Sequence, residues 1–241
     1  TAGVMTAARI LGQYRCDATV RCIAFSGEEQ WMVGSLAYAR AAHLAGENIV
    51  AAINLDMILH PGFDNAEPDP DYDLDIETDP NSSWLAEYLS QQYAQYTPID
   101  YQVLVDPDAV SDHWAFWQWG YNAVGASENT VWEIWGGSND TYHQPTDTMD
   151  TPDFDWEFGR HAIRGAVAAL AGLAGAMPMG DLNCDGTVDF NDIDPFVLAL
   201  ADPEGYVVEY PNCTSLNGDC NGDGLVDFDD INGFVALLSG G

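Results

Sequence analysis

The chain contains no lysine. Its 6 basic residues are all arginine, against 39 aspartate and glutamate residues in a chain of 241, and its formal net charge at pH 7 is −33. A surface with this sign of charge repels phosphate backbones and anionic lipid headgroups. The composition therefore excludes nucleic acid and membrane surfaces as expected partners, and it favours a solvated surface that attracts cations.

Long apolar runs are also absent. The nearest candidate for a membrane span is the stretch 162–179, which is rich in alanine and glycine and contains Arg164, so we expect a packed helix and no membrane-spanning segment. The sequence has no G-x-S-x-G motif, and none of its cysteines lies in a recognisable catalytic setting. Both absences disfavour a serine or cysteine nucleophile.

Cysteine is scarce as well. The chain has five cysteines without the spacing of metal-binding motifs, and three of them, Cys184, Cys213 and Cys220, lie in its acidic last part. We predict a disulfide between Cys184 and Cys213, with isolated buried or free thiols as the alternative. A disulfide would suit an oxidising, extracellular or cell-surface location.

Residues 1–176 alternate between helical and strand-like patterns. Helices are predicted at 1–14, 32–45, 84–96 and 155–174, and strands at 19–25, 48–56, 72–77, 101–105 and 121–126. This alternation predicts an α/β domain, a three-layer α/β/α sandwich with a mostly parallel sheet. A linker is predicted at 177–180. Residues 181–241 hold 13 acids and no basic residue, and they form a predicted second domain, small and all-α.

Acidic residues follow two of the strands predicted in the first domain. Glu28 and Glu29 come after the apolar run 19–25, and Asp56 ends the next strand. In open α/β sheets, ligands bind outside the carboxyl ends of the strands. Together with His143, which lies in a loop after the last strand, these acids predict a metal-dependent hydrolase. One glutamate would hold the metal and the other would move protons.

Four motifs within residues 1–174 occur in the order and approximate spacing of the MH-clan zinc aminopeptidases, the bacterial leucyl aminopeptidase-like enzymes. They are Gly27-Glu28-Glu29, Leu55-Asp56-Met57, Ser111-Asp112-His113 and the stretch from Tyr142-His143 to Asp147-Thr148. This part of the chain resembles that family. The resemblance implies a zinc exopeptidase fold and the removal of amino-terminal residues from peptides with the help of two zinc ions.

The resemblance also implies roles for single residues. Glu28 would be the general base, and Tyr142 would hydrogen-bond the oxyanion. Glu29 and His143 would bind one zinc ion, and Asp56 would bind the other. The neighbours Asp112 and His113 would line the site or brace its ligands by hydrogen bonds, with no role in the site as the alternative.

The family uses two further ligands, a histidine and an aspartate that bridges both zinc ions. The aspartate stands just before a segment like Thr1-Ala2-Gly3-Val4, so we expect both ligands to lie upstream of Thr1. The chain would then be an amino-terminally truncated copy that holds three of the five ligands. We expect such a fragment to bind two zinc ions weakly.

The last part of the chain contains an internal repeat. Oxygen-rich loops begin at Asp181 and Asp219, 38 residues apart, and each leads into an apolar stripe with helical spacing. Glycine at loop position 6 and oxygen donors at positions 1, 3, 5, 7, 9 and 12 are typical of calcium loops. The predicted ligands of two Ca²⁺ ions are Asp181, Asn183, Asp185, Thr187, Asp189 and Asp192 in the first copy and Asp219, Asn221, Asp223, Leu225, Asp227 and Asp230 in the second.

This repeat resembles a dockerin module over about sixty residues. The resemblance implies a duplicated EF-hand-like calcium loop, each loop followed by a helix, and a cohesin-like partner. Loop positions 10 and 11, where that family has Ser-Thr, are Phe190-Asn191 and Phe228-Asp229. Attachment to a cell-surface partner or a stabilising role is therefore the alternative to cohesin binding.

The predicted function is a secreted zinc aminopeptidase that carries a calcium-binding attachment module. Two alternatives stay open. The first is a glutaminyl cyclase-like or carboxypeptidase-like zinc enzyme on the same scaffold. The second is a catalytically inactive peptidase domain in a calcium-dependent adhesion or assembly protein.

Overall fold

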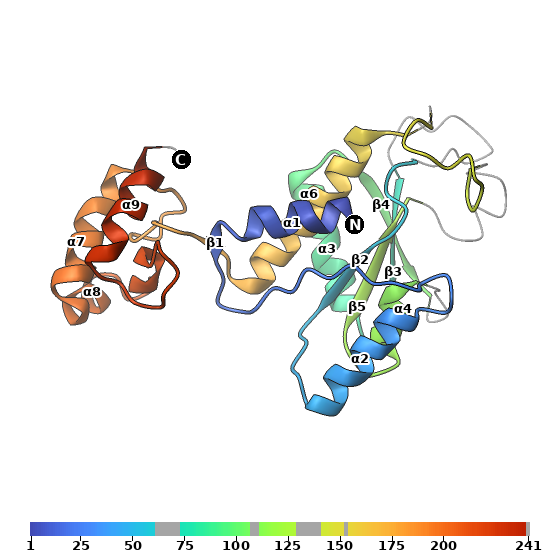
Figure 1. Cartoon of the computed structure of the whole chain (residues 1–241), viewed down its shortest axis with the longest axis horizontal. Coiled ribbons are helices and arrows are strands. Elements are labelled where there is room, and N and C mark those ends of the chain that lie inside the picture. Colours follow the sequence, from blue (N-terminus) through green and yellow to red (C-terminus); the bar gives the residue numbers. More distant parts are fainter. Residues whose placement is uncertain (61–72, 107–110, 129–140, 152–153, 240–241) are drawn as a thin grey trace. The chain divides into compact units, whose positions relative to one another are not determined.

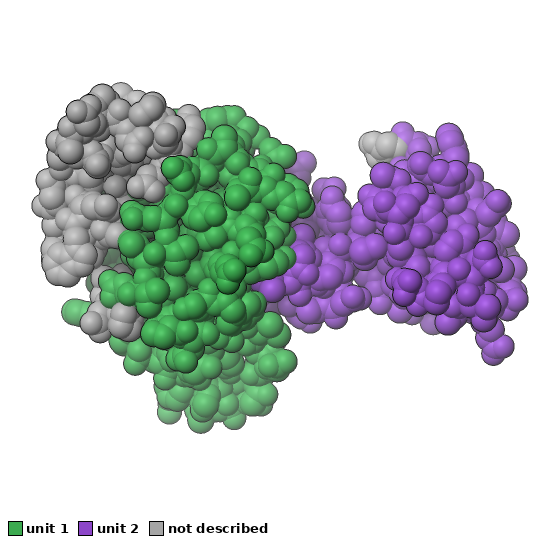
Figure 2. Space-filling model, turned by 180° about the vertical axis from the view of Figure 1, so that it is seen from behind, with its two compact units in different colours: residues 1–4, 23–169 green, residues 5–22, 170–241 purple. Residues whose placement is uncertain are grey.

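A computed structural model describes residues 1–60, 73–106, 111–128, 141–151 and 154–239. These residues form two compact units, one of residues 1–4 and 23–169 and the other of residues 5–22 and 170–241 (Figure 2). The domain boundary at 177–180 stays a prediction, because the units follow packing and not the composition of the chain.

The first unit contains the larger sheet and the helices around it. In chain order its elements, with those that continue into the second unit, are α1 (Ala2–Leu11), α2 (Val33–Ala45), β2 (Ala52–Leu55), β3 (Asp73–Thr78), α3 (Ser83–Tyr96), β4 (Asp100–Val105), α4 (Asp112–Trp117), β5 (Ala123–Ser127) and α6 (Trp156–Ala174). The second unit adds β1 (Tyr14–Arg15), β6 (Met177–Pro178), α7 (Ile193–Ala201), α8 (Pro203–Glu209), α9 (Ile231–Leu238) and the short 3-10 helices η1 (Phe190–Asp192), η2 (Ser215–Gly218) and η3 (Phe228–Asp230).

A four-stranded sheet with the order β2-β5-β3-β4 forms the centre of the first unit. β2 runs parallel to β5, β3 runs parallel to β4, and β3 runs antiparallel to β5. The mixed α/β fold with helices around a central sheet confirms the predicted fold class. The carboxyl ends of β2 and β5 meet at one end of the sheet, whereas Thr78, the last residue of β3, pairs with Val124 at the start of β5.

Helices cover both faces of this sheet. Figure 1 shows α3 and α6 on one face, and α2 and α4 on the opposite face. Leu85, Leu89 and Tyr93 of α3 are fully buried at the i, i+4, i+8 spacing of one helix face, and each such side chain contributes about 1.5 to 3 kcal/mol. The Tyr93 hydroxyl donates a hydrogen bond of 2.8 Å to the carbonyl of Ala162 in α6, so these two helices are also joined by a polar contact.

The strand predicted at 19–25 is wrong. Within the described chain these residues belong to no strand, since no neighbouring segment forms a hydrogen-bonded ladder with them. The last apolar residue of the run packs on helices instead. The ring of Phe25 contacts Tyr38 of α2 and Phe116 of α4 edge-on, with centroid distances of 5.6 and 6.1 Å. An alternating apolar pattern fits such packing as well as it fits a half-buried strand.

The second unit repeats one arrangement twice. The rings of Phe196 in α7 and Phe234 in α9 stack at a centroid distance of 4.2 Å, and they form a buried core with Leu182 and Tyr206. These phenylalanines are equivalent positions of the repeat, which explains why both helices are amphipathic. The predicted disulfide between Cys184 and Cys213 is present, and it ties the first loop to the segment after α8.

The two oxygen-rich loops share several internal hydrogen bonds. Backbone N–H groups of Gly186 and Gly224 donate to the carboxylates of Asp181 and Asp219, at 2.9 and 2.8 Å. Both glycines have a positive φ, 90° and 88°, a conformation that favours glycine. In each copy the last acid of the loop, for example Asp192, also accepts backbone N–H groups from the loop's start and from position 9.

No helix in the described part of the chain is both long enough and apolar enough to span a membrane.

Candidate active site

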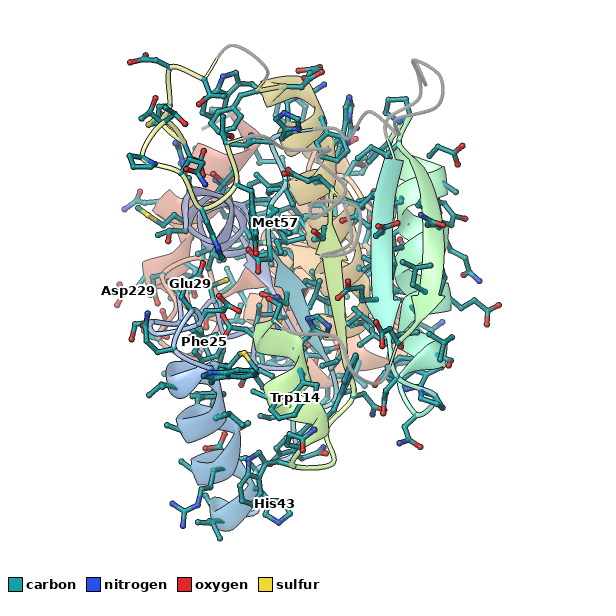
Figure 3. All side chains as sticks on the ribbon, turned by 90° about the vertical axis from the view of Figure 1, so that its right-hand side faces the viewer. Phe25, Glu29, His43, Met57, Trp114 and Asp229 are labelled. Atoms are coloured by element: carbon teal, nitrogen blue, oxygen red, sulfur yellow. A yellow bond between two sulfur atoms is a disulfide. The ribbon has the colours of Figure 1, made fainter. Side chains whose placement is uncertain are left out.

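Glu28 and Glu29 lie in a tight turn that leads into α2. Three nested backbone hydrogen bonds close this turn: Gly34 N–H donates to Ser26 C=O at 3.0 Å, Val33 to Gly27 at 2.9 Å and Met32 to Glu28 at 2.8 Å. Three residues, 29–31, therefore form the tip of the turn. Figure 3 shows Glu29 beyond the amino-terminal end of α2 and His43 near its other end.

The backbone of this turn is strained at two residues. Trp31 and Met32 have left-handed φ angles of 68° and 48°, a conformation that costs a residue other than glycine about 1 to 2 kcal/mol. The Met32 side chain is buried, with 3% of its surface exposed, and so gains packing, whereas Trp31 is 77% exposed. The packing of Met32 offsets its strain, but Trp31 has no such compensation.

Glu29 and His143 face each other. The Nε2 atom of His143 lies 2.9 Å from Oε1 of Glu29, and both side chains are about half exposed. His143 has a positive φ of 57°, and the Tyr142 ring stacks on its imidazole at 3.9 Å. The stacking restricts the orientation of the imidazole, so a loop residue far from Glu29 in sequence is held next to it.

Asp56 follows β2 and is held by a chain of two hydrogen bonds. The Ser111 hydroxyl donates to Oδ2 of Asp56 at 2.7 Å, and it accepts a bond of 2.8 Å from the side-chain amide of Asn54. The other carboxylate oxygen, Oδ1, makes no hydrogen bond within the described residues. This arrangement fixes the carboxylate and leaves one oxygen available to a ligand.

Glu28 lies among these side chains. Burial, followed by repulsion from Asp56, Glu29 and Asp112, raises the pKa of Glu28 to about 7, while His143 opposes the shift. Burial, followed by repulsion from Glu29, Glu28 and Asp56, also raises the pKa of the Tyr142 phenol. Glu28 is therefore near enough to Asp56, Glu29 and His143 to feel their charges. Direct contacts among the predicted site residues join Glu29 to His143 and His143 to Tyr142.

Asp112 and His113 begin α4 and lie in different surroundings. Burial raises the pKa of Asp112, while a hydrogen bond from Ser35 lowers it and the charge of Asp56 raises it, so Asp112 borders the site. His113 is buried in the interior, with Nε2 3.3 Å from Oε2 of Glu77 in β3. A side chain at Gly125 of β5 would collide with its ring. The structure thus places Asp112, but not His113, beside Glu28.

Two residues of the site were not assigned a role from the sequence. Ser111 is the hydroxyl that holds Asp56, and only its place directly before Asp112 points to it. Glu128 follows β5, and its Oε2 accepts the backbone N–H groups of Leu59 and His60 at 2.7 Å each. It therefore ties β5 to the segment after Asp56. An acid at a strand end is the same signal that pointed to Asp56, so the sequence could have indicated Glu128.

The site and fold can be compared with known proteins. The model of peptidase family M28 matches residues 1–169, which is most of the chain. The chain belongs to peptidase family M28. It is also 38% identical over 63 residues to a "Probable zinc metalloprotease" of Pyrenophora teres f. teres, a stretch that covers 26% of this chain and 14% of that protein.

Solved structures resemble this M28 chain in fold. The LapA aminopeptidase of Legionella pneumophila has a TM-score of 0.56 and 22% identity, over 72% of this chain and 45% of that structure. BSAP, a zinc aminopeptidase from Bacillus subtilis, has a TM-score of 0.56 and 20% identity, over 71% of this chain and 40% of that structure. The M28 chain spans less than half the length of either structure, and at these identities the likeness shows the fold alone.

The donor atoms of the M28 chain fit part of a zinc site. Two ligands of a tetrahedral zinc ion, each roughly 2.0 to 2.1 Å from the metal, lie about 3.3 Å apart, close to the 2.9 Å between Glu29 Oε1 and His143 Nε2. The oxygen Oδ1 of Asp56 is a further donor nearby. Among the described residues, no group of three or more His, Cys, Asp and Glu is arranged to hold a metal ion. A carboxylate–imidazole pair is thus in place, and a complete metal site needs more donors.

Replacing Gly34 with alanine is expected to destabilise the M28 domain by about 2 kcal/mol, because the new Cβ atom would lie 2.5 Å from the carbonyl oxygen of Ser26. The turn that carries Glu28 and Glu29 would have to open, so zinc affinity should fall with stability. Urea unfolding and zinc titration of the variant measure both effects.

Gly46 at the end of α2 provides the matched control. It has a positive φ of 70° but open space around its Cβ position, so Gly46→Ala should cost only about 1 kcal/mol and leave zinc affinity unchanged. Equal effects of the two substitutions on zinc affinity would contradict the role assigned to the turn.

Proposed function

We propose that the M28 domain of this chain belongs to a zinc-dependent aminopeptidase and supplies its general base and three metal ligands. The observation that carries the proposal is the pair of Glu29 and His143, 2.9 Å apart, beside Glu28 and Asp56. Glu29 and His143 would hold one zinc ion, and Asp56 would hold the second through its available oxygen. The likeness to zinc aminopeptidases supports this reading.

Zinc, when bound, would supply a Lewis acid that polarises the scissile carbonyl and acidifies a water molecule. Glu28 is the proton carrier: its carboxylate takes a proton from the water and passes it to the leaving amine. A pKa of about 7 suits this exchange, since the group can both accept and release a proton near neutral pH. The Tyr142 hydroxyl would donate a hydrogen bond to the carbonyl oxygen as negative charge develops on it.

The second unit serves, in this proposal, as a calcium-binding attachment module for a cohesin-like or cell-surface partner. Support comes from the two loops with matching hydrogen bonds and from the positive φ angles of Gly186 and Gly224. The disulfide between Cys184 and Cys213 is of a kind that persists in oxidising environments. It supports an extracellular or cell-surface location for the protein.

Hydrolysis of amino-acid nitroanilides tests the proposed activity in the protein that contains residues 1–241. Leucine p-nitroanilide should be cleaved, the N-acetylated substrate should not, and 1,10-phenanthroline should abolish cleavage until Zn²⁺ is restored. Residues 1–241 alone should bind zinc weakly, because the described residues bring only one close donor pair together.

Each alternative predicts a different result in the same assay. Cyclisation of glutaminyl peptides without nitroanilide cleavage would identify a cyclase, and release of carboxy-terminal residues would identify a carboxypeptidase. A protein that is loaded with zinc but cleaves none of these substrates would be an inactive peptidase domain.

A further inference from the structure

We infer that Trp31 is a specificity-determining residue, whose indole ring receives a large apolar or aromatic side chain at the amino terminus of the substrate. The inference rests on the proposed function and extends it to a substrate class. It starts from an exposed indole on a strained backbone directly beside the metal-binding pair.

The turn places Trp31 next to the site. The hydrogen bond from Met32 N–H to Glu28 C=O, 2.8 Å long, leaves only residues 29–31 at the tip. Glu29 at one side of this tip contacts His143, and Trp31 is at the other side, two residues away. A ligand bound at Glu29 and His143 therefore lies within reach of a side chain as large as tryptophan.

Contacts with the described residues do not account for this tryptophan. Trp31 is 77% exposed, and its ring makes no hydrogen bond or aromatic contact with the described residues. By contrast, Trp117 donates its indole N–H to Ala123 C=O at 2.9 Å, and Trp119 packs on His43. A left-handed φ of 68° favours glycine at position 31. Strain of this kind occurs at functional sites, where a bound ligand can use the side chain that it presents.

The surroundings indicate which side chain would bind. The carboxylates of Glu28, Glu29 and Asp56 attract the ammonium group of a peptide and repel an acidic side chain. The faces of an indole ring gain most from large apolar and aromatic groups, by burial and by ring contact. A peptide that begins with phenylalanine or leucine is therefore favoured over one that begins with alanine.

Trp31→Gly separates substrate binding from stability. The ratio of kcat/KM for phenylalanine p-nitroanilide to that for alanine p-nitroanilide should fall by about tenfold, the effect of losing one aromatic contact of roughly 1.4 kcal/mol. The melting temperature should stay the same or rise by roughly 2 to 4 °C, because glycine relieves the strain. Trp31→Phe should retain most of the selectivity. A lower melting temperature with unchanged selectivity would instead show that Trp31 stabilises the fold.

The control is Trp84, a partly exposed tryptophan of α3. Trp84 is near the start of α3, which follows the end of β3, and the end of β3 pairs with the start of β5. Asp56 lies beside the other end of β5. Trp84 and Asp56 are therefore at opposite ends of the sheet. Trp84→Ala should leave the selectivity ratio unchanged.

Binding of reduced-bond dipeptides distinguishes failure of this inference from failure of the proposed activity. Calorimetry compares the phenylalanyl and alanyl forms, neither of which can be cleaved, with the wild type and with Trp31→Gly. If the wild type cleaves no substrate but still prefers the phenylalanyl ligand through Trp31, the inference holds and the proposed activity fails. If the wild type is active and its preference is the same with glycine at position 31, the inference is wrong.

Discussion

Replacing Glu28 with glutamine is expected to abolish peptide hydrolysis and to leave the zinc content of the active protein nearly unchanged. Glutamine keeps the size of the side chain but cannot take a proton from water. Loss of a positioned general base typically lowers rates by about 10² to 10⁴-fold. Steady-state assays with leucine p-nitroanilide and metal analysis of the same preparation measure the two properties together.

Glu29→Gln is the matched variant on the neighbouring residue. Glu29 contacts His143 at 2.9 Å, so its replacement should remove zinc and activity together. If Glu28→Gln also lost its zinc, Glu28 would be a metal ligand and the assignment of the proton carrier would be wrong. The two adjacent glutamates thus have opposite expected effects on metal content.

The same substitution has a second readout in the metal-free protein. The pKa of Glu28 is raised from an ordinary value of 4.5 to about 7, first by burial and then by Asp56 and Glu29. The native state therefore binds the proton more tightly than the unfolded state. Stability is fully present below pH 4.5 and falls as the pH rises towards 7. Because Glu28 is only partly buried, solvent screening reduces its pH-dependent contribution to the free energy of unfolding to about 1 kcal/mol.

Glu28→Gln should remove this loss of stability at higher pH. Above pH 7 the metal-free variant is then expected to be more stable than the metal-free wild type, and at pH 4 the two should be equal. Urea unfolding at both pH values checks the difference. A wild type whose metal-free stability does not change between pH 4 and pH 8 relative to the variant would contradict the crowded carboxylate site.

Most helices and strands of the first unit were predictable because their patterns are long and regular. Helix α3 shows apolar residues at helical spacing, and β4 is rich in residues that favour strands. Helix α4 was not predicted, since its six residues are too few to show a period. The wrong strand at 19–25 has a different cause: a strand needs a hydrogen-bonded neighbour, and local sequence contains no information about that neighbour.

The site was predictable to the extent that its chemistry is local. Glu28 and Glu29 are adjacent, and Asp56 directly follows a strand, so residue type and position indicated them. The bond between Ser111 and Asp56 joins residues 55 positions apart, and no pattern in the sequence shows it. The left-handed backbone at Trp31 was also hidden, because a bulky residue gives no sign that its φ is positive.

Removal of calcium is expected to destabilise the second unit by about 4 kcal/mol per site at a calcium concentration a thousandfold above the dissociation constant. Each loop gathers several carboxylates, and the module that contains both has 13 acids and no basic residue. Without a cation these charges repel one another. Thermal unfolding of the intact, disulfide-bonded protein, with Ca²⁺ and with EGTA, measures the effect, and calorimetric titration should give two bound ions.

Single substitutions assign the ions to the loops. Asp181→Asn keeps an oxygen that can accept the hydrogen bond from Gly186 N–H, but it removes the charge, so it should reduce the number of bound Ca²⁺ ions from two to one. Asp219→Asn should do the same in the second loop. Asp194 is an exposed acid of α7 outside the loops, and Asp194→Asn removes an equal charge from the same module without changing the stoichiometry.

Salt distinguishes calcium binding from simple relief of repulsion. Concentrated NaCl screens the carboxylates in every variant alike. In EGTA it should therefore raise the stability of Asp181→Asn and Asp194→Asn equally, whereas Ca²⁺ should stabilise Asp194→Asn more. If NaCl stabilised the unit as fully as Ca²⁺ does, or if EGTA had no effect, the loops would be acidic turns held by their own hydrogen bonds. The positive φ of Gly186 and Gly224 would then serve only the turn, and the proposal of a calcium-binding module would be wrong.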